Sequence, residues 1–254
     1  IDAIVVENKS GRGASAAGTV IDATGDADVC HAAGEPVATL PTNVLAGWFY
    51  HTDGAEMKLN PMSKPFDENG AAPPEGIRGY AGHRAEEVTQ FVLDANADIR
   101  RALDRLNADS SAPVEPVVLP TAPNFRMTRR LKGAVELERA HAGAHFDDAI
   151  GQTGDWRRAG PVYAIPWRAL VATKTDNLIT AGRCISAASA WDVTRAIPAC
   201  AVTGEAAGAA AGLAAKQGLA TLSNLDMALL QSELKRRGVP LPGTATGNSA
   251  KNIK

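Results

Sequence analysis

Two segments of the chain share one local pattern, and this pattern constrains the fold more than any other feature. Residues 20–28 have the sequence VIDATGDAD and residues 176–184 have DNLITAGRC, so in each an apolar strand ends in a glycine among polar residues. Such a glycine lets the backbone come close to a ligand, and ligands of open α/β sheets bind at the carboxyl ends of strands. We therefore expect an α/β fold in which Gly25 and Gly182 lie close together. Each segment alone also fits a plain strand and turn, with Asp28 capping a following helix.

A third segment predicts a helix that begins at Pro198 and ends near Gly218. Proline is favoured in the first turn of a helix, where its missing N–H is not needed. The first turn also has unpaired N–H groups and a partial positive charge, so it can hold an anionic group. The many alanines and glycines of this segment fit a plain buried helix equally well.

The spacing of apolar residues predicts the remaining elements. From residue 84 to 106 they recur at three- and four-residue steps, which is typical of an amphipathic helix, and a final helix is expected over 225–237. Residues 8–13 predict a turn, and residues 36–82 predict mostly irregular structure because they contain many prolines and glycines. The predicted strands are residues 4–7, 17–23, 44–51, 114–119, 162–172 and 177–181.

The composition argues against several classes of function. The chain has 254 residues, with 26 Lys and Arg against 28 Asp and Glu, and this near-neutral balance does not favour nucleic acid or an anionic membrane surface as a partner. No apolar run of about 18 residues and no signal peptide occur, so we expect a cytoplasmic protein without a membrane partner. The three cysteines are far apart and the histidines lack metal-ligand spacing, so we expect neither a disulfide framework nor a metal site.

Taken in order along the chain, these segments resemble the FAD-dependent oxidoreductase family. Members of this family fuse an N-terminal dinucleotide-binding unit to a split flavin domain with an inserted substrate domain. The helix from Pro198 belongs to the resemblance. The other segments that carry it are IDATGD at 21–26 with AGEP at 33–36, TRRLKG at 128–133, YAIPWRAL at 163–170 and residues 177–186.

The resemblance implies the fold and the domain organisation. The expected fold is α/β, with a partial flavin-binding, Rossmann-like domain and an inserted α+β substrate or cap domain. Residues 1–35 and 126–220 would form the FAD-binding domain. Residues 36–125 would form the inserted domain, and residues 221–254 a C-terminal helix with a frayed tail.

The resemblance also implies FAD as the cofactor and a set of residues that bind it. Thr24, Gly25 and Asp26 would lie near the adenosine and pyrophosphate, and Gly182 and Arg183 would pass the phosphates and the ribityl chain. The amides at the start of the helix from Pro198 would face the flavin ring and stabilise its reduced, negatively charged form. These are the amides of Ala199 and Cys200.

Three arginines are candidates for contact with a small-molecule substrate. If the family geometry holds, Arg195 would lie over the flavin ring just before the helix, where Asp192 could orient it. Arg129 and Arg130 could bind a substrate carboxylate through paired N–H donors, although arginines in such a cluster also commonly form salt bridges on the protein surface. The expected reaction is transfer of hydride equivalents between a small organic substrate and flavin.

The sequence departs from the family pattern in its glycine-rich turn. No G-x-G-x-x-G motif occurs, and the chain opens at Ile1 in a strand-like run. We therefore expect this chain to be a fragment that is inactive alone. Its partner would be the missing N-terminal dinucleotide-binding segment. The alternative is a non-catalytic, truncated module that has lost flavin binding and acts only as a binding partner. A nicotinamide-dependent dehydrogenase is favoured less, because it needs the same glycine turn.

Overall fold

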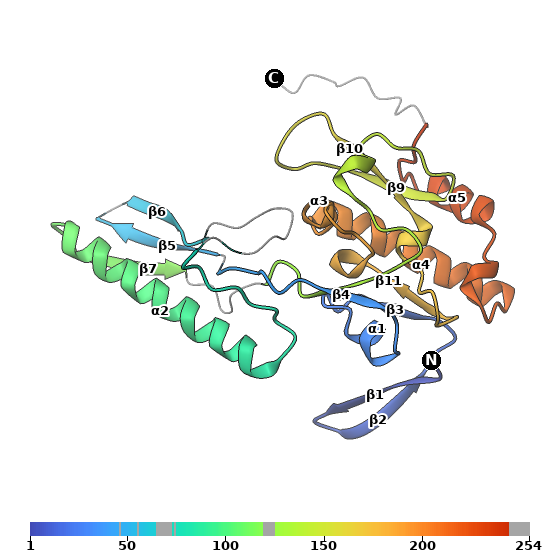
Figure 1. Ribbon diagram of the computed structural model, residues 1–254, viewed down its shortest axis with the longest axis horizontal. Helices are drawn as coiled ribbons and strands as arrows, with labels where there is room; N and C mark the ends of the chain where they lie inside the picture. The colour runs from blue at the N-terminus through green and yellow to red at the C-terminus, as the bar shows by residue number, and fades with distance from the viewer. Residues whose placement is uncertain (46, 55, 65–72, 74, 119–124, 244–254) are drawn as a thin grey trace. The chain divides into compact units, whose positions relative to one another are not determined.

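The chain divides into two units, each with its own helices and strands (Figure 1). The computed structural model describes residues 1–45, 47–54, 56–64, 73, 75–118 and 125–243. Unit 1 comprises Ile1–Ala38 with Arg129–Lys254, and unit 2 comprises Thr39–Thr128. This mixed content of helices and strands agrees with an α/β fold class. The expected flavin and substrate domains stay a prediction, because the division does not show what either unit binds.

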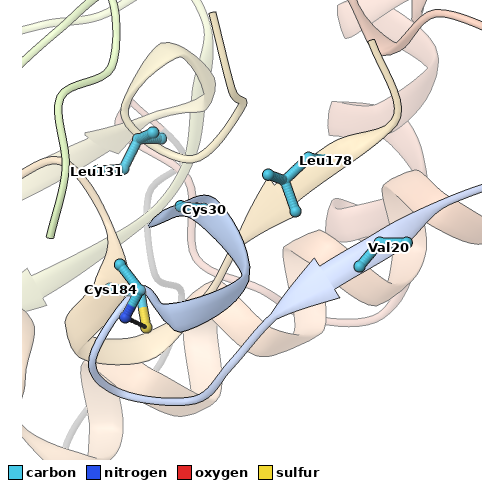
Figure 2. Packing of buried hydrophobic residues seen from close by; sticks show 6 residues of the cluster. Val20, Cys30, Leu131, Leu178 and Cys184 are labelled. Carbon is cyan, nitrogen blue, oxygen red and sulfur yellow. Dashed lines mark hydrogen bonds between the residues drawn. The ribbon is translucent and has the colours of Figure 1, made fainter. Parts of the chain in front are cut away.

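In unit 1, the two strands that share the glycine pattern lie side by side. β3 (Val20–Asp22) and β11 (Leu178–Thr180) pair in parallel, with Asp22 opposite Thr180. The prediction that the two strand ends meet is therefore confirmed. One buried cluster supports the pair (Figure 2), with contributions from α1 (Asp28–Ala32) and from β8 (Arg129–Leu131), which pairs with β4 (Val37–Thr39). The cluster consists of Val20, Ala27, Cys30, Leu131, Leu178 and Cys184.

The first hairpin differs from its prediction. β1 (Ala3–Asn8) pairs with β2 (Gly11–Ala16), so the second half of the segment predicted as a turn, residues 11–13, begins the second strand. The turn can be this short because the Asn8 side chain accepts a hydrogen bond from the Ser10 amide at 2.8 Å. Gly11 adopts a φ of 101°, which favours glycine. The strand predicted over 17–23 is correspondingly shorter and forms β3.

A second antiparallel pair of strands in unit 1 packs against a long helix, α4 (Ile197–Gln217). β9 (Ala149–Gly154) was not predicted, and it pairs with β10 (Val162–Pro166). The strand predicted over 162–172 ends at Pro166 because Trp167–Ala169 form a 3-10 helix. At Gly151 a Cβ atom would overlap the side chain of Val202, so the glycine lets the helix approach the strand closely.

The predicted C-terminal helices are both confirmed. α4 (Ile197–Gln217) ends at Gly218, which has a φ of 63°, and α5 (Met227–Arg236) is capped by the Asp226 carboxylate. α4 is long and apolar enough to cross a membrane by length and composition. Core helices share these properties, and α4 packs against β9 and α5 as a core helix does.

Unit 2 is a three-stranded antiparallel sheet with one long helix. β5 (Trp48–Asp53) lies between β6 (Glu56–Pro61) and β7 (Val114–Val118). α2 (Ala85–Asp109) packs against the sheet by burying Ile99 and Ala102 with Phe49. The predicted helix is confirmed, and so is the strand predicted over 114–119 as far as Val118, because residue 119 lies outside the described residues. The strand predicted over 44–51 overlaps β5, which begins later, and the expectation of irregular structure is wrong for β6.

The sheet of unit 2 is apolar on the face turned away from Phe49. Successive residues of a strand point to opposite faces, so Trp48, Tyr50 and Thr52 lie on one face and the buried Phe49 and His51 on the other. Residues that are directly paired across strands share a face. This exposed face carries the side chains of Trp48, Tyr50, Met57, Leu59 and Val118. Apolar residues on both faces mask the alternation from which a strand is usually predicted.

Ion pairs anchor the short helix α3 (Trp191–Thr194) to the end of β9 in unit 1. The buried carboxylate of Asp155 accepts hydrogen bonds from Nε and Nη2 of Arg157 at 2.9 and 3.0 Å. Arg157 also pairs with the buried carboxylate of Asp192 in α3, which Arg139 contacts at 3.0 Å. Arg158 contacts Asp155 at 3.2 Å as well, so two buried carboxylates and three guanidinium groups form one network, and the position of α3 depends on it.

We expect this network to weaken in acid. The hydrogen bonds from Arg157 lower the pKa of the Asp155 carboxyl to about 2, against about 3.9 in an unfolded chain. Because the folded pKa is below the unfolded one, the stabilisation is present above the unfolded pKa. It is lost as the pH falls through the folded pKa, between about pH 4 and pH 2.

Urea unfolding of the wild type and of Asp155→Asn at a series of pH values measures this effect. The free energy of unfolding of the variant should lie below that of the wild type near neutral pH, because the Arg157 guanidinium loses one of its two carboxylate partners. The difference should shrink as the pH approaches about 2. A difference that stays constant over the whole range would contradict the assignment.

Candidate functional site

One buried carboxylate organises the turn that follows β3. Asp22 ends the strand and is fully buried. Its Oδ1 accepts hydrogen bonds from the amide and the hydroxyl of Thr24 at 3.1 and 2.7 Å, and its Oδ2 accepts one from the Cys30 amide at 2.9 Å. Gly25 follows with a φ of 84°, which favours glycine. The turn is therefore fixed by the strand that precedes it.

A cysteine sulfur joins this turn to the one that follows β11. Cys184 belongs to the 3-10 helix η3 (Gly182–Cys184), and its Sγ accepts hydrogen bonds from the Gly25 amide at 3.0 Å and the Ala27 amide at 3.4 Å. Figure 2 shows this sulfur at the edge of the buried cluster. Burial raises the pKa of the Cys184 thiol to about 11, so the sulfur accepts these bonds as a neutral thiol near neutral pH.

Arg183 makes a second connection between the two turns. Its Nε donates to the Gly25 carbonyl, and its Nη2 lies 2.7 Å from the carboxylate of Asp26. A Cβ atom at Gly25 would lie 2.9 Å from this Nε, so only glycine leaves room for the guanidinium. The side chains of Arg183 and Asp26 are 29% and 31% exposed, and both present polar atoms to solvent beside the turn.

The start of α4 lies against the turn that follows β11. The Gly182 amide donates to the hydroxyl of Thr203 at 2.9 Å, and a Cβ atom at Gly182 would lie 3.5 Å from the sulfur of Cys200. The Cys200 amide donates to the Ala196 carbonyl at 2.9 Å. This amide is therefore used within the helix, and its assignment to the flavin ring stays a prediction. Ala199 lies in the first turn, where amides lack partners within the helix, but its side chain is buried.

Arg195 lies between α3 and α4 and stacks on an aromatic ring. Its guanidinium carbon lies 5.2 Å from the centroid of the Trp191 ring, which is buried. α3 packs against both η3 and α4, so Arg195 belongs to the same region as the two turns. Asp192, which we expected to orient Arg195, contacts Arg139 and Arg157.

The other two predicted arginines are held by carboxylates of the protein. Arg129, the first residue of β8, pairs with Asp28 and donates from its Nε to the Asp26 carbonyl at 3.2 Å. It therefore links β8 to the turn that follows β3. Arg130 contacts Glu136 at 2.7 Å. These ion pairs favour a structural role, and the assignment of Arg129 and Arg130 to substrate stays a prediction.

The turn after β3 also shows that Asp28 is not the helix cap. Ala27 occupies the cap position of α1 with a φ of 51°, and Asp28 is the first helical residue. The Asp28 amide donates to the hydroxyl of Thr24 at 3.1 Å. The Thr24 side chain of the preceding turn thus binds the start of this helix, and the interpretation in which Asp28 caps the helix is wrong.

The donor set gathered here fits part of an FAD molecule. The partly exposed Arg183, which pairs with Asp26, suits a phosphate, the carboxylate of Asp26 suits a ribose hydroxyl, and a helix start suits the polar edge of the flavin ring. The glycine-rich turn that would hold the pyrophosphate does not occur in the sequence. The residues present therefore fit the sugar, phosphate and flavin-edge contacts.

Sequence reasoning missed three residues that build this site. Asp22 could have been found as the only charged residue in an apolar strand that is expected to be buried. Thr203 and Cys184 had no signal, because a single hydroxyl or thiol forms no recognisable pattern.

We expect Cys184→Ala to destabilise the protein more than Cys30→Ala does. Both cysteines are fully buried in one cluster, so both changes leave a similar cavity. Only Cys184→Ala removes the acceptor of the Gly25 and Ala27 amides, which should add about 1–2 kcal/mol to the cost. Urea unfolding of the two variants measures the difference. Equal losses would mean that the sulfur of Cys184 contributes packing alone.

A comparison with protein families identifies the chain at the level of the family. The family model described as FAD dependent oxidoreductase matches residues 51–234, which is more than half of the chain. The match includes β11, η3, Arg195 and α4, and it begins after β3. No curated protein and no solved structure matches the chain. The family match shows that the chain belongs to the FAD dependent oxidoreductases.

Proposed function

We propose that unit 1 holds FAD at the two joined turns and the start of α4, and that the protein transfers hydride equivalents between a small organic substrate and this flavin. The observation that supports the proposal most is the direct bonding of the turns through Arg183 and Cys184. Two strand ends of a parallel pair thereby present polar groups in one place, as dinucleotide sites of α/β sheets do. A Rossmann-like arrangement of unit 1 is part of this proposal.

In this proposal, the residues of unit 1 bind and orient the cofactor. Arg183 binds a phosphate, Asp26 and Thr24 bind the ribose, and the Ala199 amide at the start of α4 faces the polar edge of the flavin ring. FAD supplies the hydride acceptor when it is bound. The protein side chains contribute position and charge, and a segment with a glycine-rich turn would supply the remaining pyrophosphate contacts.

Arg195 is the residue that we assign to the substrate. A guanidinium beside the flavin ring can hold an anionic substrate in place and can stabilise charge that develops during hydride transfer. Its guanidinium carbon lies 5.2 Å from the centroid of the Trp191 ring, within the range of a cation–π contact that restricts the side chain. We therefore favour small organic acids as substrates over neutral alcohols.

Arg195→Ala in the FAD-loaded protein tests this function. The variant should keep its FAD content and lower kcat/KM by about 100-fold, which corresponds to about 2.7 kcal/mol of transition-state stabilisation. The assay is anaerobic flavin reduction by a panel of small acids, alcohols and amines. Loss of thermal stability together with FAD, and normal turnover per remaining flavin, would contradict the catalytic assignment. The measurements are made with a segment that carries a glycine-rich turn supplied to the chain, and a wild-type protein that fails to bind FAD even then would support the non-catalytic module instead.

We also propose that unit 2 is the substrate domain. One face of its sheet carries the apolar side chains of Trp48, Tyr50, Met57, Leu59 and Val118, together with the polar Thr52 and Glu115. Soluble proteins seldom expose such a face without a binding role, because its contact with water is unfavourable. An apolar ligand is the kind that this face suits.

Leu59→Asp, compared with Leu93→Asp, tests this role of the sheet face. The two leucines are 52% and 55% exposed, one on the sheet face and the other on α2. Both changes should alter the free energy of unfolding by less than about 0.5 kcal/mol, because exposed sites tolerate substitution. Only Leu59→Asp should raise KM, by about tenfold or more. Equal KM values in the two variants would refute the assignment.

A further inference from the structure

Trp156 presents most of its ring to solvent from the loop between β9 and β10. The residue is 61% exposed, although tryptophan is highly buried on average in folded proteins. Its indole Nε1 donates a hydrogen bond to the Asp192 carbonyl at 3.1 Å. The one polar group of the side chain therefore has a partner, and the surface that stays open to a ligand is the apolar ring.

The residues on both sides of Trp156 fix the loop that carries it. Asp155 is 6% exposed, and its carboxylate accepts hydrogen bonds from the amide and the Nε of Arg157 at 3.1 and 2.9 Å. The Asp155 amide donates to the Pro161 carbonyl at 3.1 Å, and the Arg158 amide donates to the Asp155 carbonyl at 3.2 Å. The exposed ring is thus presented by a loop that is bonded within itself, and it is held at a second point by α3.

The bond from the indole lies where α3 ends and α4 begins. Carbonyl groups of a helix point toward its C-terminal end, and Asp192 is the second residue of the four in α3. The chain then leads directly to Ile197, the first residue of α4, which is 86% exposed. Among the described large apolar residues of unit 1, Ile197 and Trp156 are the two most exposed. Two large apolar side chains are thus left open to solvent at the start of one helix.

These two side chains together offer an apolar binding surface. The indole N–H is used by the Asp192 carbonyl and an isoleucine side chain has no polar atom, so neither binds a substrate hydroxyl. A hydroxyl that loses water on binding and gains no partner costs free energy, whereas an apolar ring or branched chain gains by leaving water. This surface therefore favours apolar substrates over sugars and other polyols.

We propose that Trp156 and Ile197 determine substrate specificity by contacting an apolar, non-reacting part of the substrate. This inference rests on the proposed function, in which the start of α4 faces the flavin ring, because a substrate that reacts at this ring lies next to the start of the same helix. It assigns the substrate class as small organic molecules that carry an aromatic ring or a branched aliphatic chain.

The first measurement is of binding, and it requires no turnover. FAD-loaded protein, with a segment that carries a glycine-rich turn supplied, is titrated with benzoate and with gluconate, and the absorbance of the oxidised flavin is followed. Both probes are carboxylates of similar size, but one carries an apolar ring and the other a chain of hydroxyl groups. The wild type should bind benzoate more tightly by about tenfold or more. Trp156→Ala should weaken benzoate binding by about tenfold and leave gluconate binding within about twofold.

Three further variants separate the ring from its hydrogen bond and from the loss of any exposed apolar residue. Trp156→Phe keeps an aromatic ring and loses the indole N–H, so it should retain most of the affinity for benzoate. Ile197→Ala should weaken benzoate binding by about threefold, since it removes less apolar surface than Trp156→Ala. Leu229→Ala is the matched control, because Leu229 is 40% exposed on α5 of the same unit, and it should leave both affinities unchanged.

The indole N–H resonances test the contact directly. The chain has four tryptophans, and the resonance of Trp156 is identified in ¹⁵N-labelled protein by its loss in Trp156→Phe. Benzoate should shift this resonance, because the ring current of the bound probe acts on the indole. It should leave the resonance of Trp167, which is 5% exposed, unchanged.

The outcomes distinguish this inference from the proposed function. If the wild type binds benzoate no more tightly than gluconate, or if Trp156→Ala and the wild type bind benzoate equally, the inference is overturned. A Trp156 resonance that does not move at a benzoate concentration that changes the flavin spectrum also overturns it. In each case, a flavin that binds and is reduced by a small organic substrate leaves the proposed function standing. If the wild type holds no FAD even with the supplied segment, the proposed function fails, and the inference fails with it.

Discussion

The hydrogen bonds between the turn after β3 and the turn after β11 are the interaction on which unit 1 depends. Arg183 and Cys184 bind Gly25 across 158 and 159 residues of chain, and the loop that they close contains all of unit 2. The entropic cost of closing a loop rises only slowly with its length, so an insertion of this size is tolerated once the turns fit each other. The fit requires a glycine, because the Arg183 guanidinium occupies the space of a Cβ atom.

The helices of this fold could be predicted because their signals are local. A 3.6-residue apolar period, a proline at the start and a glycine at the end identified α2 and α4 to within a few residues. β2, β5 and β9 were missed or poorly placed for a different reason. β2 has the sequence GRGASA without a large apolar residue, the hairpin of β5 is apolar on both faces, and Gly151 in β9 is explained only by a helix that packs on it.

The candidate site was predictable in its location and less so in its chemistry. The repeated glycine pattern predicted the meeting of Gly25 and Gly182, because parallel strands place their carboxyl ends together. The hydrogen bonds and ion pairs of a polar group, however, depend on which other groups lie near it in the folded protein. The Cys200 amide is used by Ala196, and the guanidinium groups of Arg129 and Arg130 are paired with Asp28 and Glu136. Nothing in the spacing of residues along the chain shows which carboxylate will be near.

Ion pairs link distant segments of unit 1 through its arginines. A guanidinium paired with two carboxylates fixes two segments together, as Arg157 does between Asp155 and Asp192. The ion pairs that anchor α3 therefore do more than stabilise a short helix. They also fix the buried ring of Trp191, because Trp191 precedes Asp192 in α3, and the guanidinium carbon of Arg195 lies 5.2 Å from the centroid of this ring.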